Sequence, residues 1–194
     1  NGTKLFVPNA HVSDYIVVAA RTGSGENDIS LFIVSSQTNG VNQTLLKTIA
    51  SDRQSEVSFD NVSVSSSSLL GEKNQGWKTI EKVLKWGAIG KCAEMSGGGQ
   101  SVLDMTVEYA KQRTQFGRPI GTFQAIQHHC ANMATDVEGA KFITYQAAWM
   151  LSEGLPADRE VAMSKAWVSD SYKRVCALGH QSDRKSTRLN SSHW

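Results

Sequence analysis

The chain has 194 residues, of which 40% are hydrophobic and 20% charged, and this composition is typical of a globular protein. Its length allows one large domain or two small ones, and no apolar run approaches the ~20 residues that a membrane-spanning helix needs. The formal net charge is only +2, so charge gives no indication of a nucleic-acid or membrane-surface partner.

The first third of the chain is predicted to form β-structure. Tyr15–Ala20 and Ile29–Val34 are rich in β-branched and aromatic residues, and the glycine-containing segment 23–28 between them predicts a hairpin-type loop. Glu56–Phe59 alternates polar with apolar residues, as a strand with one solvent-facing side does. The serine run Ser65–Ser68 is expected to be a loop at the boundary. These short strands predict a small antiparallel sheet or barrel.

After Gly71 the apolar residues recur with a helical period, and three long helices are expected. They run from Trp77 to about Gln112, from about Phe123 to Glu153, and from about Ala157 to Leu178. Long helices with short connections pack as an antiparallel bundle. The predicted fold class is therefore α+β, with a small antiparallel β domain over residues 1–70 and an antiparallel α-helical bundle over residues 71–181.

Two features of the helices carry structural expectations. Three glycines, 97–99, lie inside the first helix, and each costs up to ~1 kcal/mol relative to alanine, so we expect a neighbour to approach closely there. Cys92, Cys130 and Cys176 are far apart and lie in helical patterns. They are expected to be small buried hydrophobic residues in a reducing compartment, and not disulfide partners or zinc ligands.

The stretch Glu108–Ile126 connects the first two helices. Gly117 and Pro119 are predicted to stop the first helix, and Thr122 is a candidate N-cap of the second. Arg113 lies near the end of the first helix, where a cation interacts favourably with the helix dipole. Spacing alone predicts a helix–helix corner with a solvated arginine.

The residues taken alone predict no catalytic or metal site. His128 and His129 are adjacent, so on a helix they point about 100° apart and are poorly placed to share a metal. No Ser-His-Asp or Cys-His set can be assigned, and no phosphate-binding glycine loop or metal-ligand spacing occurs.

Five short sequence motifs occur in order along the chain. They are Asn1-Gly-Thr-Lys-Leu-Phe-Val-Pro-Asn9, Phe59-Asp-Asn-Val62, Leu70-Gly-Glu72 with Gly76-Trp77, Tyr109-Ala110 with Arg113-x-Gln115-Phe116-Gly117 and Phe123-Gln124, and finally Gln181. Together they resemble motifs of the acyl-CoA dehydrogenase family over residues 1 to 181, and the fourth motif is the most specific to that family. Gln181 is similar to the first residue of the family's Gln-x-x-Gly-Gly-x-Gly motif.

The resemblance implies that the cofactor is FAD. It carries nine cofactor-contact positions onto this chain: Phe6, Val7, Pro8, Arg113, Gln115, Phe116, Phe123, Gln124 and Gln181. The guanidinium of Arg113 suits a pyrophosphate, because it can form two parallel charge-assisted hydrogen bonds. Pro8 departs from the family's usual Thr or Ser and lacks both a hydroxyl and a backbone N–H, so the hydrogen bond to the flavin edge is lost.

The resemblance also implies α,β-desaturation of an acyl-CoA thioester, with electrons passing to an electron-transfer flavoprotein. Assembly is expected to be a homotetramer in which sites are completed between chains. Location is expected to be cytoplasmic in a bacterium or in the mitochondrial matrix of a eukaryote, without secretion. The alternatives are a flavin oxidase or monooxygenase of the same fold, and a non-catalytic helical scaffold.

No catalytic base is assigned in this chain. Gly87 stands where isovaleryl- and long-chain-type members place a catalytic Glu, and Glu94 lies ~10 Å further along the helix, too far to replace it.

Residues Asp183–His193 match the translation of a sequencing-library adapter, so residues 182–194 are interpreted as a tail outside the fold. That tail carries the whole formal excess of positive charge. The chain is thus expected to be an inactive fragment of an enzyme.

Overall fold

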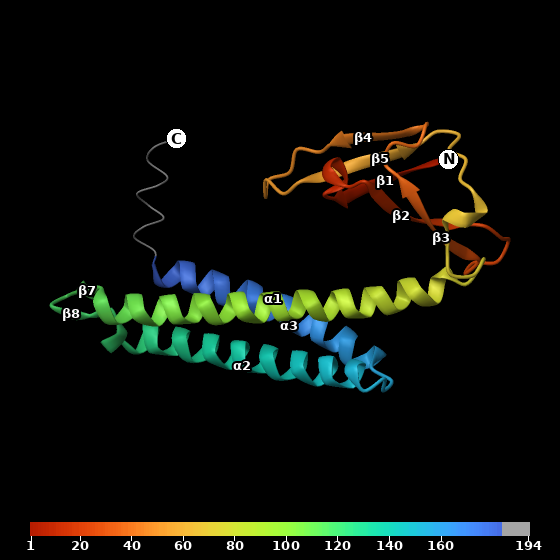
Figure 1. The fold of residues 1–194 in the computed structure, drawn as a ribbon. Coiled ribbons are helices and arrows are strands. Elements are labelled where there is room, and N and C mark those ends of the chain that lie inside the picture. Colours follow the sequence, from red (N-terminus) through yellow and green to blue (C-terminus); the bar gives the residue numbers. More distant parts are fainter. Residues whose placement is uncertain (184–194) are drawn as a thin grey trace. The chain divides into compact units, whose positions relative to one another are not determined.

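The computed structural model describes residues 1–183, so the adapter-like segment from residue 184 onward lies outside the described residues. The chain divides into two compact units, one of Asn1–Lys82 and one that begins at Val83. The first contains antiparallel sheets and the second a bundle of long helices (Figure 1). The predicted fold class is confirmed.

The β unit contains two three-stranded antiparallel sheets rather than a single sheet. In the first, β1 and β4 flank the central strand β5; in the second, β2 and β6 flank the central strand β3. Their bounds are β1 Gly2–Pro8, β2 Tyr15–Arg21, β3 Ile29–Ser35, β4 Val41–Leu45, β5 Gln54–Phe59 and β6 Leu69–Leu70. Short 3-10 helices cover Ala10–Val12 and Ser66–Ser68. Strand β4 was missed by the sequence analysis because only its two end residues are apolar.

The hairpin loop between β2 and β3 forms where it was predicted. Arg21 pairs with Ile29, and the loop closes when the backbone N–H of Gly25 donates to the Asp28 carboxylate at 2.7 Å. The buried hydroxyl of Ser30 accepts from the backbone N–H of Asn74 at 2.8 Å, which fixes the segment that leads into the first long helix.

The three helices are α1 (Gly76–Gln112), α2 (Gln124–Ser152) and α3 (Asp158–Ser182). α1 begins in the β unit and continues into the helical unit, and α3 extends past its predicted end at Leu178. Among the described helices, none combines the length and the apolar character that a bilayer crossing requires.

Buried side chains between the helices form three successive clusters. Each cluster contains residues of α2 and of α3 or its N-cap: Ile89, Ala147, Ala157 and Val161; Cys92, Ala140 and Val168; and Met133, Val137 and Val175. The buried residues of α2 are spaced three or four apart, as the predicted stripe required. Cys92 is buried, whereas Cys130 and Cys176 are half-buried; all three are free thiols.

The glycine triplet of α1 is approached by side chains. A Cβ on Gly98 would lie 3.1 Å from the ring of Tyr172, and one on Gly99 would lie 3.5 Å from Val137. A Cβ on Gly97 would meet nothing within 4 Å. The expected close approach is therefore made at Gly98, by Tyr172 of α3, whereas a Cβ on Gly99 would make only an ordinary van der Waals contact with α2.

Candidate functional site

The connection between α1 and α2 is a small β-hairpin. α1 ends at Gln112, and β7 (Thr114–Gln115) pairs with β8 (Arg118–Pro119) in antiparallel register. The two turn residues, Phe116 and Gly117, have φ angles of 54° and 77°. Two successive positive φ angles are the mark of a type I′ turn, which suits a two-residue hairpin. The prediction that Gly117 stops the helix was therefore wrong, because Gly117 serves the hairpin turn.

The start of α2 also differs from the prediction. Thr122 belongs to a 3-10 turn, Ile120–Thr122, and its hydroxyl donates to the carbonyl of Pro119 at 2.7 Å. The N-cap is Phe123, which offers no side-chain acceptor, and the first turn of α2 contains no acidic residue. α2 thus has no side-chain cap. The N–H of Ile126 already donates to the carbonyl of Phe123 at 3.0 Å, so the amides of Gln124 and Ala125 are the ones that keep their capacity to face an anion.

Arg113 is held by its backbone at the junction of α1 and the hairpin. Its N–H donates to the carbonyl of Tyr109 at 2.8 Å, and its own carbonyl accepts from the N–H of Ile120 at 2.8 Å. Across residues 1–183 the structure shows no hydrogen bond or ion pair for its half-buried guanidinium. This side chain remains available for an external acceptor.

Two predicted contact residues are phenylalanines in a left-handed backbone conformation. Phe116 lies at the hairpin tip and is 93% exposed. Phe6 has a φ of 58°, is 64% exposed, and lies where the β1–β5 register shifts between Lys4 and Val7. A bulky residue at positive φ is strained, and such strain concentrates at functional sites. Both positions therefore expose an aromatic ring at a conformational cost.

Arg118 is a site residue that the sequence analysis missed. Its Cζ lies 4.3 Å from the ring centroid of Phe123, a cation–π geometry. Phe123 in turn meets the edge of Phe116, with 6.1 Å between ring centroids and an interplanar angle of 84°. No signal in the sequence marks Arg118, because its place opposite Gln115 depends on a hairpin whose Phe-Gly turn is not one of the usual turn pairs.

The helical unit gathers six of the nine predicted contact residues at one end. Because α1, α2 and α3 alternate in direction, α1 and α3 both end at the end of the bundle that carries the hairpin. The hairpin segment supplies Arg113, Gln115, Phe116, Phe123 and Gln124, and the exposed Gln181 lies in the last turn of α3. Phe6, Val7 and Pro8 lie on β1 in the β unit, where Pro8 pairs with Gln54 and Val7 with Ser55.

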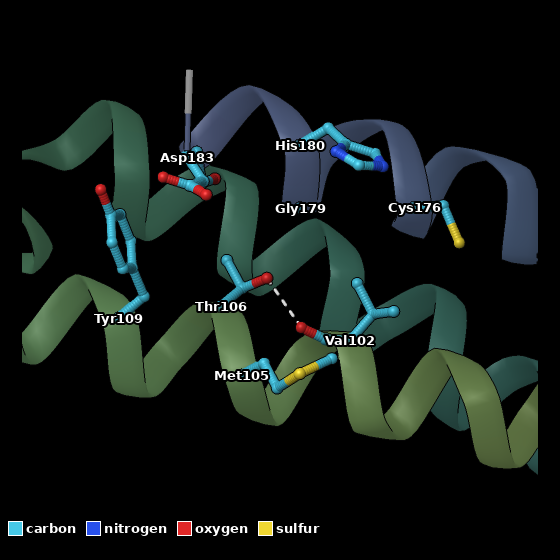
Figure 2. A pocket seen from close by; sticks show the side chains of 9 residues that line it. Val102, Met105, Thr106, Tyr109, Cys176, Gly179, His180 and Asp183 are labelled. Carbon is cyan, nitrogen blue, oxygen red and sulfur yellow. Dashed lines mark hydrogen bonds between the residues drawn. The ribbon is translucent and has the colours of Figure 1, made fainter. Parts of the chain in front are cut away.

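A pocket of about 410 Å³ lies between the C-terminal halves of α1 and α3 (Figure 2). Its lining is Val102, Met105, Thr106 and Tyr109 from α1, and Cys176, Gly179, His180, Ser182 and Asp183 from the end of α3. Burial raises the pKa of the Tyr109 phenol, the Asp183 carboxylate adds to the increase by accepting its hydrogen bond and by its charge, and the Arg113 guanidinium opposes it. The phenol is therefore a protonated donor one turn before Arg113.

The chain offers no catalytic constellation of its own within the described residues. No group of three or more His, Cys, Asp or Glu residues there could hold a metal ion. Glu94 forms an ion pair with Lys91 at 2.6 Å, and a Cβ on Gly87 would face open space.

Two domain models of one protein family match the chain, one after the other. The family model described as the acyl-CoA dehydrogenase middle domain matches residues 1–62, and that of the acyl-CoA dehydrogenase C-terminal domain matches residues 74–181. The chain belongs to the acyl-CoA dehydrogenase family.

Individual relatives are similar along almost all of the chain. A 3-(aryl)acrylate reductase of Clostridium sporogenes is 41% identical over 181 residues, which are 90% of this chain and 48% of that protein. The structure of butyryl-CoA dehydrogenase from Megasphaera elsdenii superposes with a TM-score of 0.87 at 33% identity, covering 94% of this chain and 49% of the other. PigA with FAD and proline gives 0.90 at 28% identity, with 94% and 49% covered. The chain spans about half the length of the curated relatives it matches.

Proposed function

We propose that this chain contributes the middle and C-terminal domains of an FAD-dependent acyl-CoA dehydrogenase. The observation that carries the proposal is the end of the bundle beside the hairpin. There the uncommitted guanidinium of Arg113 and the exposed ring of Phe116 accompany the uncapped N-terminus of α2.

The chemistry of these groups fits FAD. A guanidinium and helix N-terminal amides are the donors that bind a diphosphate in proteins. Gln115 and Gln124, both exposed, add amide groups that can donate to or accept from the same molecule. In the β unit, Phe6, Val7 and Pro8 would lie along the flavin ring, where Pro8 supplies shape without a hydrogen-bond donor. Bound FAD would accept the hydride that leaves the substrate.

The residues of this chain would orient the cofactor, and the proton would be removed elsewhere. Desaturation needs a carboxylate that takes the weakly acidic α-proton of the thioester. Gly87 has no side chain, and Glu94 is ion-paired on an exposed helix face. We therefore place the general base in a part of the whole protein outside this chain, and we expect the chain alone to be inactive.

One relative favours the reverse direction as a second candidate. The protein of Clostridium sporogenes is named as a reductase of 3-(aryl)acrylates. The same site could add hydrogen across a conjugated double bond when reduced flavin is supplied. Incubation of the whole protein with a saturated and with an α,β-unsaturated thioester, each with a matching dye, would show which direction dominates.

The partners follow from the same proposal. We propose acyl-CoA as substrate, an electron-transfer flavoprotein as electron acceptor, and a homotetramer in which one chain's hairpin contacts FAD held mainly by another. The corresponding location is the cytoplasm of a bacterium or the mitochondrial matrix.

Arg113→Ala in the whole protein tests the cofactor site. Loss of a charge-assisted pair of hydrogen bonds is expected to weaken FAD binding by roughly tenfold or more, because such bonds contribute about 1.5–3 kcal/mol. The matched control is Arg159→Ala, an exposed arginine in the first turn of α3, which should leave the dissociation constant unchanged. Fluorimetric titration of the apoprotein with FAD gives the measurement. Equal FAD affinity for Arg113→Ala and wild type would contradict the proposal and favour a non-catalytic scaffold.

A further inference from the structure

Three side chains at the hairpin form a connected series of contacts. The guanidinium of Arg118 lies over one face of the Phe123 ring at 4.3 Å, and Phe116 meets the same ring edge-to-face at 6.1 Å. Arg118 itself is fixed by strand pairing opposite Gln115. Phe123 therefore links Arg118 to the residue at the hairpin tip.

These contacts restrict the orientation of the Phe116 ring. The left-handed conformation of Phe116 is unfavourable for a bulky residue, and its ring is 93% exposed, so little else holds the ring in one orientation. A planar guanidinium can stack on an aromatic face and still leave its edge in water. Stacked on Phe123, Arg118 restricts that ring and so provides a fixed surface for Phe116.

We propose that Arg118 is a positioning residue for the FAD contact surface, acting through Phe123 on Phe116. The inference rests on the proposed function of the hairpin and adds to it the residue that holds its aromatic pair in place. The alternative is that Arg118 binds the diphosphate directly by charge. The geometry favours positioning, because the guanidinium of Arg118 already lies over a ring, whereas that of Arg113 has no hydrogen bond or ion pair among residues 1–183.

A double-mutant cycle separates the two roles. In the whole protein, Arg118→Ala is expected to raise the FAD dissociation constant about 2- to 5-fold, the range of an exposed cation–π contact. In a Phe123→Leu background the same change should have almost no effect, since the ring on which Arg118 acts is gone. Arg118→Lys, which keeps the charge and loses the planar stack, should fall between wild type and Arg118→Ala.

Two results would overturn the proposal. An equal weakening by Arg118→Ala with and without the Phe123 ring would mean direct charge contact with the cofactor. No weakening in either background would mean that Arg118 is a surface cation. If the wild-type whole protein binds no FAD, the proposed function itself fails, and the cycle does not bear on it.

A second measurement does not depend on FAD. Hydrogen exchange of the apoprotein reports the Ile120 amide, which donates to the carbonyl of Arg113 across the hairpin. Arg118→Ala should accelerate this exchange about 2- to 5-fold while the amides of the α2 interior remain as protected as in wild type. Unchanged exchange at Ile120 would show that Arg118 does not brace the hairpin.

Discussion

Single residues at the hairpin show a conflict between local preference and the conformation adopted. A type I′ turn favours Asn, Asp or Gly at its first central position, yet this chain has Phe116 there. Gly117 satisfies the second position without cost, because glycine lacks the Cβ that positive φ angles bring into collision. A strained, exposed aromatic residue beside an uncommitted arginine is what a binding role would explain and a purely structural turn would not.

Phe116→Asn tests whether this strain serves binding. Asn tolerates the left-handed conformation, but the variant also loses the edge contact with Phe123, so the free energy of unfolding should change by less than about 1 kcal/mol while FAD binding weakens. Phe142→Asn is the matched control, because Phe142 is also exposed but lies within α2. There Asn is a poorer helix former, and stability should fall slightly with no change in FAD affinity. Denaturant unfolding and FAD titration give both quantities; a Phe116→Asn protein that binds FAD as tightly as wild type does would contradict the argument.

At the scale of elements, the sequence predicted the long helices well and their connections poorly. Periodic apolar residues such as Met133, Val137 and Ala140 mark a buried helix face directly, because each lies about one turn from the next. The hairpin between α1 and α2 could not be predicted in the same way. Its two strands have two residues each, too few to show alternation, and its turn begins with a residue that normally avoids such turns.

Only those residues of the candidate site that belong to a known sequence motif could be predicted. Arg113, Gln115 and Phe116 belong to a short motif, whereas the role of Arg118 depends on its distance from a ring five residues away. The cap prediction for Thr122 was wrong by one residue: α2 begins at Gln124 with Phe123 as its N-cap, and Thr122 ends the preceding 3-10 turn, where its hydroxyl donates to the carbonyl of Pro119. Local propensity does not show where a preceding turn shifts the start of a helix.

Helix packing between α1 and α3 gives a prediction with an internal control. A Cβ on Gly179 would lie 2.8 Å from a methyl group of Val102, a β-branched side chain with little freedom to move. Gly179→Ala should therefore lower the free energy of unfolding by about 1–3 kcal/mol. Gly97→Ala, in α1 with nothing within 4 Å, should instead raise it by up to ~1 kcal/mol. Equal effects of the two substitutions in urea unfolding would show that α3 does not pack on α1 in this register.

At the scale of the whole molecule, each unit has its own core. The β unit buries Leu31, Val34 and Val57, while every member of the three helical clusters lies between Ile89 and Val175. The boundary between the units falls inside α1, at Lys82 and Val83, so one helix belongs to both. A helix shared in this way connects two cores covalently without requiring that they fold together.

Residues 71–182, expressed alone, should therefore fold into a helical bundle. Their core clusters are complete without residues 1–70, so circular dichroism should show high helicity and a cooperative thermal transition.

Val168→Ala within this segment distinguishes a packed core from a loose one, because Val168 is fully buried in the middle cluster. Removing its two methyl groups should lower the free energy of unfolding by roughly 1–3 kcal/mol. Lys173→Ala, on the exposed side of the same helix, should change it by less than about 0.5 kcal/mol. A broad transition that Val168→Ala does not shift would mean that the helices need the β unit to pack.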